Sequence, residues 1–293
     1  AIQRMDAETA NKQGKVSYVD YKRVINDYLI PVLGNRTITN IDSSALDDFA
    51  ARRIEMMQRA PSQSTILTHN AALNRVFDEA VIRGFLTDAN RPKLDAKGKT
   101  GDRRPAFEIE ELRAVINNFD GWIARARNDK SKDMRTLLRD YVEMLIDTGA
   151  RPGKELLDLK WRQIKFAIKP TITKTDAVDE DGDAIELANL NRSVEMTVTG
   201  KTGTRTIVGM RRTVQVLERI AKRIYDIDDS ITNPIAKLTT GSNNDEVFRV
   251  KDDRELNSLQ HMFESYLKEH NLLIDKRTGQ KRVFYSLRHT YAT

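Results

Sequence analysis

Residues 194–209, VEMTVTGKTGTRTIVG, determine the fold class of this chain. Apolar and polar residues alternate on both sides of Gly200-Lys201-Thr202-Gly203, and glycine adopts the positive φ angles that tight hairpin turns require. The stretch is therefore predicted to form an antiparallel β-hairpin. Further β-branched runs precede it at 164–168 and 172–175, so the hairpin is expected to belong to a small antiparallel sheet.

Helical patterns flank this sheet on both sides. Apolar residues recur at spacings of three and four along residues 18–31, 43–57, 64–83, 108–119, 133–147, 213–225 and 255–270. Pro31 is expected to end the first helix, and Ser64 is a candidate N-cap of the third. The predicted fold is mainly α with a small antiparallel sheet. The predicted domains are a helical one over 1–90 and a larger one over 105–293.

The basic charge of the chain is concentrated between these domains. The 293 residues include 49 Lys and Arg against 43 Asp and Glu, a formal net charge of +6. Residues 91–104, RPKLDAKGKTGDRR, hold six basic and two acidic residues and carry most of that excess. Two interpretations remain open for this stretch: a solvated linker, or a strap that lies along nucleic-acid phosphates.

Composition excludes several classes of protein. The chain has no cysteine, which rules out disulfides, a thiol nucleophile and cysteine zinc sites. Its four histidines are scattered without metal-ligand spacing, so neither a metal nor another cofactor is expected. No run of 18 apolar residues and no signal-peptide pattern occurs, which favours a cytoplasmic protein without membrane contact.

Two local patterns resemble ligand-binding motifs but do not match them. The acidic stretch 176–186 lacks the glycine and glutamate positions of an EF-hand, so a solvated excursion between strands is expected. Gly200–Gly203 lacks the spacing of a P-loop and lies at a hairpin tip, which argues against nucleotide binding.

Three other places are more informative together than alone. Arg151 lies in the glycine-flanked corner DTGARPG between two predicted helices, and Lys201 lies at the hairpin tip. Near the end of the chain, Tyr285, Arg288 and His289 fall on one face of a predicted helix at spacings i, i+3 and i+4. Each residue taken alone is also compatible with an ordinary surface position.

Taken together, these side chains suit chemistry at a phosphodiester. A phosphorus under attack gains negative charge on its non-bridging oxygens, and guanidinium groups bind such oxygens bidentately without losing their charge. A lysine ammonium can donate a proton to the leaving oxygen. This chemistry needs no metal ion.

Three segments carry a resemblance to the tyrosine recombinases of the phage-integrase type. IDTGARPGKELLDLKW (146–161) resembles the family's first arginine box, TGKTGTRTIV (199–208) its hairpin lysine motif, and VFYSLRHTYAT (283–293) its second arginine box. The helices before residue 90 resemble its core-binding domain. The resemblance implies a two-domain C-clamp around duplex DNA, with residues 91–104 as the basic linker.

The resemblance also implies a reaction and roles for the residues. A tyrosine attacks the scissile phosphate and forms a 3′-phosphotyrosyl bond, and a 5′-hydroxyl later reverses this step without ATP or metal. Arg151 and Arg288 match the two arginines, and Lys201 matches the general acid. His289 matches a supporting residue. The implied partners are attachment-site DNA, on which a homotetramer assembles, and accessory DNA-bending proteins. The implied location is the nucleoid.

The sequence departs from the family pattern in three ways. Tyr285 occupies a position that is usually His, and a phenol is a poor base at neutral pH. Glu155 lies four residues after Arg151, whereas the family more often has an acid at three. Thr293 ends the chain before the family's nucleophile, so we expect a C-terminally truncated enzyme. Tyr291 is expected to belong to the core.

Contacts of the first domain with DNA are expected on the polar face of its third predicted helix. Ser64, Thr65, Thr68 and His69 lie near the start of that helix, where backbone N–H groups favour phosphate. Lys22 on the first predicted helix is a further candidate.

The resulting hypothesis is a site-specific DNA recombinase of a prophage or genomic island. A catalytically silent DNA-binding protein with the same fold is the main alternative, because Tyr285 replaces His and the nucleophile is missing. The second alternative is a type IB topoisomerase, which uses the same chemistry.

Overall fold

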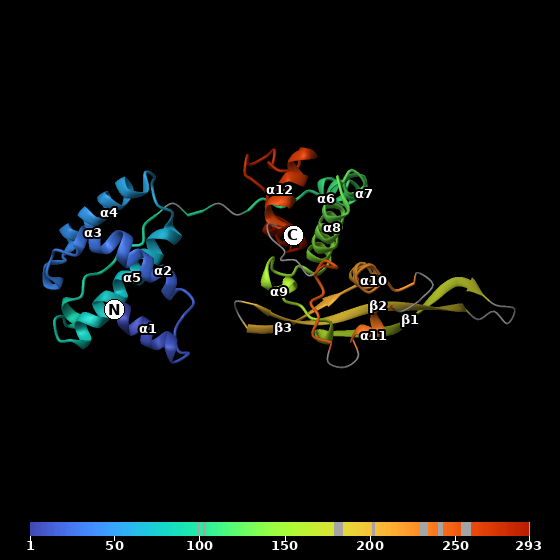
Figure 1. Cartoon of the computed structure of the whole chain (residues 1–293), viewed down its shortest axis with the longest axis horizontal. Coiled ribbons are helices and arrows are strands. Elements are labelled where there is room, and N and C mark those ends of the chain that lie inside the picture. Colours follow the sequence, from blue (N-terminus) through green and yellow to red (C-terminus); the bar gives the residue numbers. More distant parts are fainter. Residues whose placement is uncertain are drawn as a thin grey trace. The chain divides into compact units, whose positions relative to one another are not determined.

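The computed structural model describes residues 1–293 apart from 99, 102–103, 179–183, 201–202, 229–233, 240–242, 253–258 and 293. The chain divides into two compact units, residues 1–103 and 104–293 (Figure 1). The first unit is helical and the second combines helices with a three-stranded antiparallel sheet, so the predicted fold class is confirmed. No described helix has an apolar stretch long enough to cross a bilayer.

Unit 1 is built around the packing of its longer helices. Its helices are α1 (Ile2–Ala10), α2 (Tyr18–Val24), α3 (Ile30–Leu33), α4 (Ser43–Met57) and α5 (Gln63–Ile82), with a π-helical turn at Ile25–Leu29 and 3₁₀ turns at Ile38–Asn40 and Asp88–Asn90. The buried core includes Val24 from α2, Phe49 from α4, and Leu73 and Phe77 from α5. Burial of these apolar faces stabilises helices that would be marginal alone.

The expectation that Pro31 ends the first long helix is wrong. Helical structure continues through Pro31 to Leu33, because a π-helical turn at Ile25–Leu29 separates α2 from α3. Proline lacks an N–H and its ring crowds the carbonyl four residues earlier. The wider π turn changes the hydrogen-bond register just before Pro31, so the proline falls in the first turn of a new helical segment.

The ends of α4 and α5 are set by side-chain caps. The Asp42 carboxylate accepts a hydrogen bond from the Ala45 backbone N–H at 2.9 Å, so α4 begins at the predicted residue. The cap of α5 is Ser62, whose hydroxyl accepts from the Thr65 N–H at 3.3 Å. Ser64, the candidate N-cap, instead lies within the first turn.

Much of the predicted linker packs against α5 of unit 1. Arg91 forms an ion pair with Asp78 at 2.8 Å, and Asn70 donates to the backbone carbonyl of Asp95 at 2.9 Å. A Cβ on Gly98 would lie 2.8 Å from the Cα of Gln63, so the backbone passes directly over the start of α5. Residues 91–98 are therefore not a freely solvated linker.

Unit 2 surrounds its sheet with helices. They are α6 (Ile109–Asn117), α7 (Phe119–Ala124), α8 (Asp129–Thr148), α9 (Lys154–Leu157), α10 (Arg211–Tyr225), α11 (Pro234–Thr239), α12 (Leu259–Glu269) and α13 (Phe284–Ala292), with a 3₁₀ turn at Trp161–Gln163. Helix α8 begins four residues earlier than predicted, because the Asn128 side chain caps it by accepting from the Ser131 N–H at 2.8 Å.

The sheet has the order β1 (Ile164–Val178), β2 (Ala184–Gly200) and β3 (Gly203–Gly209), with antiparallel neighbours. Gly200 pairs with Gly203 at the tip of the predicted hairpin, which is confirmed. The two predicted runs before it merge into one strand that includes Pro170. Because β1 is an edge strand, it can accommodate a residue without a backbone N–H.

Helix α10 packs on the sheet and helps to bury the core of unit 2 (Figure 1). Val214 and Leu217 of α10 belong to the same buried cluster as Met196 and Val198 of β2. The start of α10 is fixed by Asp147, which accepts a hydrogen bond from the Thr213 backbone N–H at 3.1 Å. This contact attaches α10 to the end of α8, directly before the glycine-rich corner.

Candidate active site

The corner that follows α8 is shaped by two glycines with positive φ. Gly149 ends the helix with φ +59°, and Gly153 has φ +98°. The Gly153 N–H donates to the hydroxyl of buried Tyr141 at 2.7 Å, and burial raises the pKa of Tyr141 to about 12. The chain therefore reverses sharply between α8 and α9, and Arg151 lies at the bend.

Arg151 is held by Glu155 through two hydrogen bonds. The backbone N–H of Arg151 donates to Oε2 of Glu155 at 2.8 Å, and its Nη1 donates to Oε1 at 2.6 Å. The Glu155 side chain is 2% exposed, whereas that of Arg151 is 28% exposed. The carboxylate four residues after Arg151 thus orients its guanidinium group.

A second arginine shares the same carboxylate. Nη2 of Arg205, on β3, donates to Oε2 of Glu155 at 2.9 Å. Burial alone would raise the pKa of Glu155, but hydrogen bonds from Arg205 and Arg151 outweigh it and lower this pKa from 4.5 to about 2. Glu155 is therefore ionised at neutral pH and holds two guanidinium groups near one another.

The stability of unit 2 should depend on this carboxylate in acid. Because the folded-state pKa of Glu155 is depressed, its contribution is complete above the unfolded-state value and is lost as the pH falls toward 2. Between about pH 5 and about pH 2, we expect wild type to lose roughly 2–3 kcal/mol of unfolding free energy relative to Glu155→Gln. Denaturant unfolding followed by circular dichroism at each pH measures this difference. Parallel curves for the two proteins would contradict it.

The hairpin tip begins beside Glu155. A Cβ on Gly200 would overlap Oε1 of Glu155, so only glycine fits at this end of β2. Lys201 follows directly in the sequence but lies outside the described residues. The structure therefore brings the base of the lysine-bearing turn to the arginine corner.

Arg288, near the C-terminal end of the sequence of unit 2, contacts the same corner. It lies on α13 and its Nη1 donates to the backbone carbonyl of Gly149. This acceptor is neutral, so the charge of Arg288 is not balanced by it. Gly149 lies two positions before Arg151, which places both predicted arginines at one corner.

Tyr291 lies against the same glycine, but it is not in the core. A Cβ on Gly149 would overlap the ring of Tyr291, so the ring packs directly on the glycine backbone. The residue is nevertheless 57% exposed, and the expectation that it is buried is wrong. Glycine offers no side chain to enclose the ring, and the apolar face of α13 is formed by Phe284 and Leu287.

An open cleft of about 390 Å³ lies between β3, the corner and α13. It is lined by Thr148, Gly149, Arg205, Thr206, Ile207, Val208, Arg288 and Tyr291. Two guanidinium groups thus face one cavity, and Arg151 is linked to it through Glu155. Of the other predicted residues on α13, Tyr285 and His289 do not line this cleft; Tyr285 is 46% exposed and His289 is partly buried.

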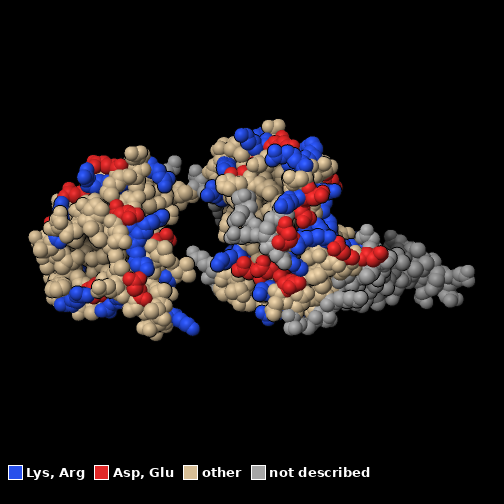
Figure 2. Space-filling model, in the orientation of Figure 1, with Lys and Arg blue, Asp and Glu red and all other residues tan. Residues whose placement is uncertain are grey.

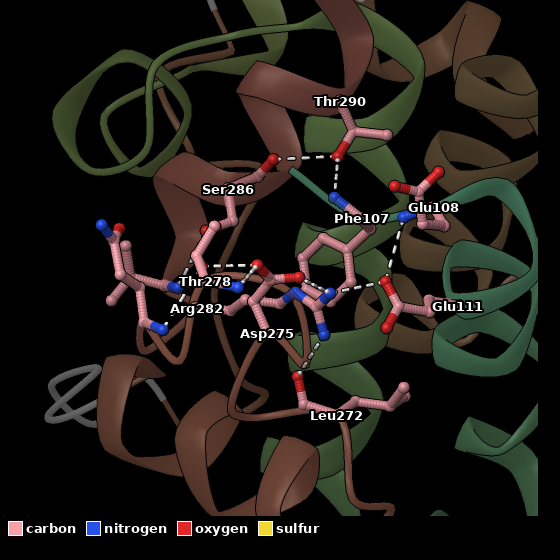
Figure 3. Close-up of polar contacts among 11 residues, drawn as sticks. Phe107, Glu108, Glu111, Leu272, Asp275, Thr278, Arg282, Ser286 and Thr290 are labelled. Carbon is pink, nitrogen blue, oxygen red and sulfur yellow. Dashed lines mark hydrogen bonds and ion pairs between the residues drawn. The ribbon is translucent and has the colours of Figure 1, made fainter. Parts of the chain in front are cut away.

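Helix α13 is fixed to the start of unit 2 by a buried polar cluster (Figure 3). Arg282 is 1% exposed and donates to Glu111 at 2.5 Å, to Asp275 at 2.9 Å and to the Leu272 carbonyl at 3.0 Å. Its guanidinium also lies 4.8 Å from the ring centre of Phe107.

The same segment is bonded to α13 through its backbone. The Phe107 N–H donates to the Thr290 hydroxyl at 2.8 Å, and this hydroxyl donates to the Ser286 carbonyl at 2.9 Å. Thr290 lies two residues after Arg288. These bonds hold the helix that carries Arg288 in a defined position within the unit.

The predicted DNA-contacting residues of unit 1 differ in accessibility. Ser64 is exposed, Thr65 and Thr68 are partly exposed, and Lys22 is paired with Asp6 at 2.7 Å. His69 is 4% exposed and its ring centre lies 4.7 Å from that of Tyr28, so it contributes to the core instead of the surface. On the face seen in Figure 2, basic and acidic side chains are interspersed over both units.

Sequence reasoning missed Arg205, although a signal was present. In a strand, residues two apart share a face, and Arg205 lies on the same face of β3 as buried Ile207. An arginine on the apolar face of a strand needs a buried acceptor, which Glu155 provides. No three His, Asp or Glu side chains of the described residues converge as a metal site would require.

Comparison with known proteins reveals similarity at the level of structure. No protein-family profile matches the chain, and no curated protein sequence matches it. A similar solved structure is that of the Tn1549 transposon integrase in complex with transposon right end DNA, with a TM-score of 0.59 and 16% sequence identity. The match covers 99% of this chain and 84% of that one, so the two share a fold.

Proposed function

We propose that this chain belongs to a tyrosine recombinase, which cuts and rejoins DNA at specific sites. The observation that carries the proposal is that three distant segments meet beside one cleft: the Arg151 corner, the β2–β3 hairpin, whose Gly200 contacts Glu155 and whose Arg205 lines the cleft, and Arg288 of α13. The shared fold with a transposon integrase supports it.

In the proposed reaction, the scissile phosphate binds in the cleft. Guanidinium groups of Arg288, Arg151 and Arg205 stabilise the charge that develops on its non-bridging oxygens. A tyrosine whose phenolic proton has passed to solvent attacks phosphorus, and the bond to the 5′-oxygen breaks. The Lys201 ammonium transfers a proton to that oxygen. The phosphotyrosyl ester conserves the bond energy, and a 5′-hydroxyl from another duplex completes strand exchange.

The proposed partners follow from the same resemblance. The proposed partner is attachment-site duplex DNA, on which four copies are proposed to assemble with accessory proteins that bend the DNA. The exposed first turns of α5, with Ser64, Thr65 and Thr68, are proposed to lie near the backbone of the DNA. The gene is proposed to belong to a prophage or genomic island, and the protein to act at the nucleoid.

The test is formation of a covalent protein–DNA complex. We expect the full-length protein, incubated with a nicked suicide duplex that carries its attachment site, to form an ester that survives denaturing electrophoresis without ATP. Mass mapping of the DNA-linked peptide should identify a tyrosine. Duplex binding without any covalent product would support the catalytically silent alternative.

A second assay separates recombination from topoisomerase activity. A type IB topoisomerase relaxes supercoiled plasmid as a monomer, whereas a recombinase should join two duplexes only after assembly on paired sites. Plasmid relaxation without a requirement for such sites would favour the topoisomerase.

A further inference from the structure

Arg53 of unit 1 is a buried charge that has no acceptor within the described part of the chain. It is 6% exposed, and its Nε is enclosed without a hydrogen-bond partner. Its two terminal nitrogens also form no hydrogen bond or ion pair with the described residues but are not enclosed in the same way. The guanidinium lies 5.3 Å from the ring centre of Phe49, which fixes its direction without neutralising it.

The contrast with Arg282 shows what such a group normally requires. Arg282 is also buried, but it is bonded to two carboxylates and a backbone carbonyl. A buried guanidinium without acceptors destabilises a fold, because desolvation is not offset by an ion pair. Arg53 therefore weakens unit 1 unless an anion from outside the chain completes the site.

The surroundings of Arg53 include a buried histidine and an exposed arginine. His69, also buried, has an Nδ1 without a hydrogen-bond partner, and its pKa is lowered to about 4 by burial and by the charges of Arg53 and Arg23. No carboxylate contributes to that change. Arg23 is exposed and lies 3.6 Å from Asp20, whereas His69 with this pKa is neutral at pH 7, so the buried charge of this pair is that of Arg53.

We propose that Arg53 is an anion site for one phosphodiester of the DNA backbone. This inference rests on the proposed function, because a DNA duplex is the anion that such an enzyme binds. The guanidinium is already desolvated and oriented by Phe49, so a phosphate that reaches its terminal nitrogens gains a charge-assisted, bidentate contact. The bound phosphate also removes the instability of the unpaired charge.

The test compares Arg53→Met with Arg52→Met. Methionine keeps most of the side-chain volume on Phe49 but removes the charge. Arg52 is the neighbouring residue on α4, is 65% exposed and is paired with Glu55, so it controls for the loss of one positive charge. The probe is a short duplex of random sequence, bound to the full chain and measured by fluorescence anisotropy at several salt concentrations.

For Arg53→Met, we expect the affinity for the duplex to fall about 10- to 100-fold and the salt slope to decrease by about one. We also expect its melting temperature to equal or exceed that of wild type. Arg52→Met should bind within about threefold of wild type. The chain has only four histidines, so the His69 ring resonance can be followed by NMR, and it should shift on addition of duplex in wild type but not in Arg53→Met.

Three results would overturn the proposal: unchanged binding by Arg53→Met, an equal loss in Arg52→Met, or a lower melting temperature in Arg53→Met, which would make Arg53 structural. These outcomes can be distinguished from a failure of the proposed function. Formation of the covalent complex by the full-length protein, together with unchanged binding by Arg53→Met, removes only the Arg53 site. If the wild-type protein does not bind duplex, both the Arg53 site and the proposed function are excluded.

Discussion

Replacing Arg288 by alanine is expected to slow DNA strand cleavage roughly 10²- to 10³-fold, the usual cost of removing one donor that stabilises transition-state charge. Arg288 lines the cleft, and the acceptor of its Nη1 is the neutral carbonyl of Gly149. Its charge therefore remains available to a phosphate. The measurement is the rate of covalent complex formation on a nicked suicide duplex in the full-length protein.

Arg151→Ala should give a loss of the same order, because Glu155 presents this guanidinium in a fixed direction. Duplex affinity should stay within about threefold of wild type for both variants, because many other contacts bind the DNA. Arg113, exposed on α6, provides the matched control, and Arg113→Ala should cleave normally. Normal cleavage by Arg288→Ala or Arg151→Ala would remove the assignment of this cleft as the active site.

The second large effect concerns the proton donor at the hairpin tip. Lys201→Ala should slow cleavage about 10²- to 10⁴-fold, the range that general acid catalysis contributes. A substrate with a 5′-thio leaving group needs no proton to depart, so it should restore the rate to within about tenfold of wild type. The same substrate should not rescue Arg288→Ala, whose role is to stabilise charge. Equal behaviour of the two variants with this substrate would exclude Lys201 as the acid.

The hairpin and most helices of this protein could be predicted because their signals are local. Alternation around Gly200–Gly203 and the cap at Asp42 involve residues within one turn or one hairpin. The same holds for Arg151, whose glycine-flanked corner is visible in the sequence. Its orienting partner Glu155 lies only one helical turn away.

Other features could not be predicted from local sequence patterns, because they depend on which distant segments of the chain come into contact. Arg205 is separated from Glu155 by 50 residues, and their ion pair exists only because β3 folds back beside α9. His69 and Arg53 look like ordinary polar residues of amphipathic helices, yet the packing of α4 against the rest of unit 1 buries both. Tyr291 shows the opposite case, an aromatic residue that stays exposed.

The order of residues was thus sufficient to predict a mainly helical chain with one small sheet and to identify two arginines and a lysine suited to phosphate chemistry. Periodicity, caps and turns depend on residues that are close together in the sequence, so they can be recognised from the sequence alone. The cleft shared by Arg205 and Arg288, the depressed pKa of Glu155 and the unpaired charge of Arg53 arose only on folding. Burial and long-range contacts set the local dielectric and the neighbouring charges, and these depend on the whole packed arrangement.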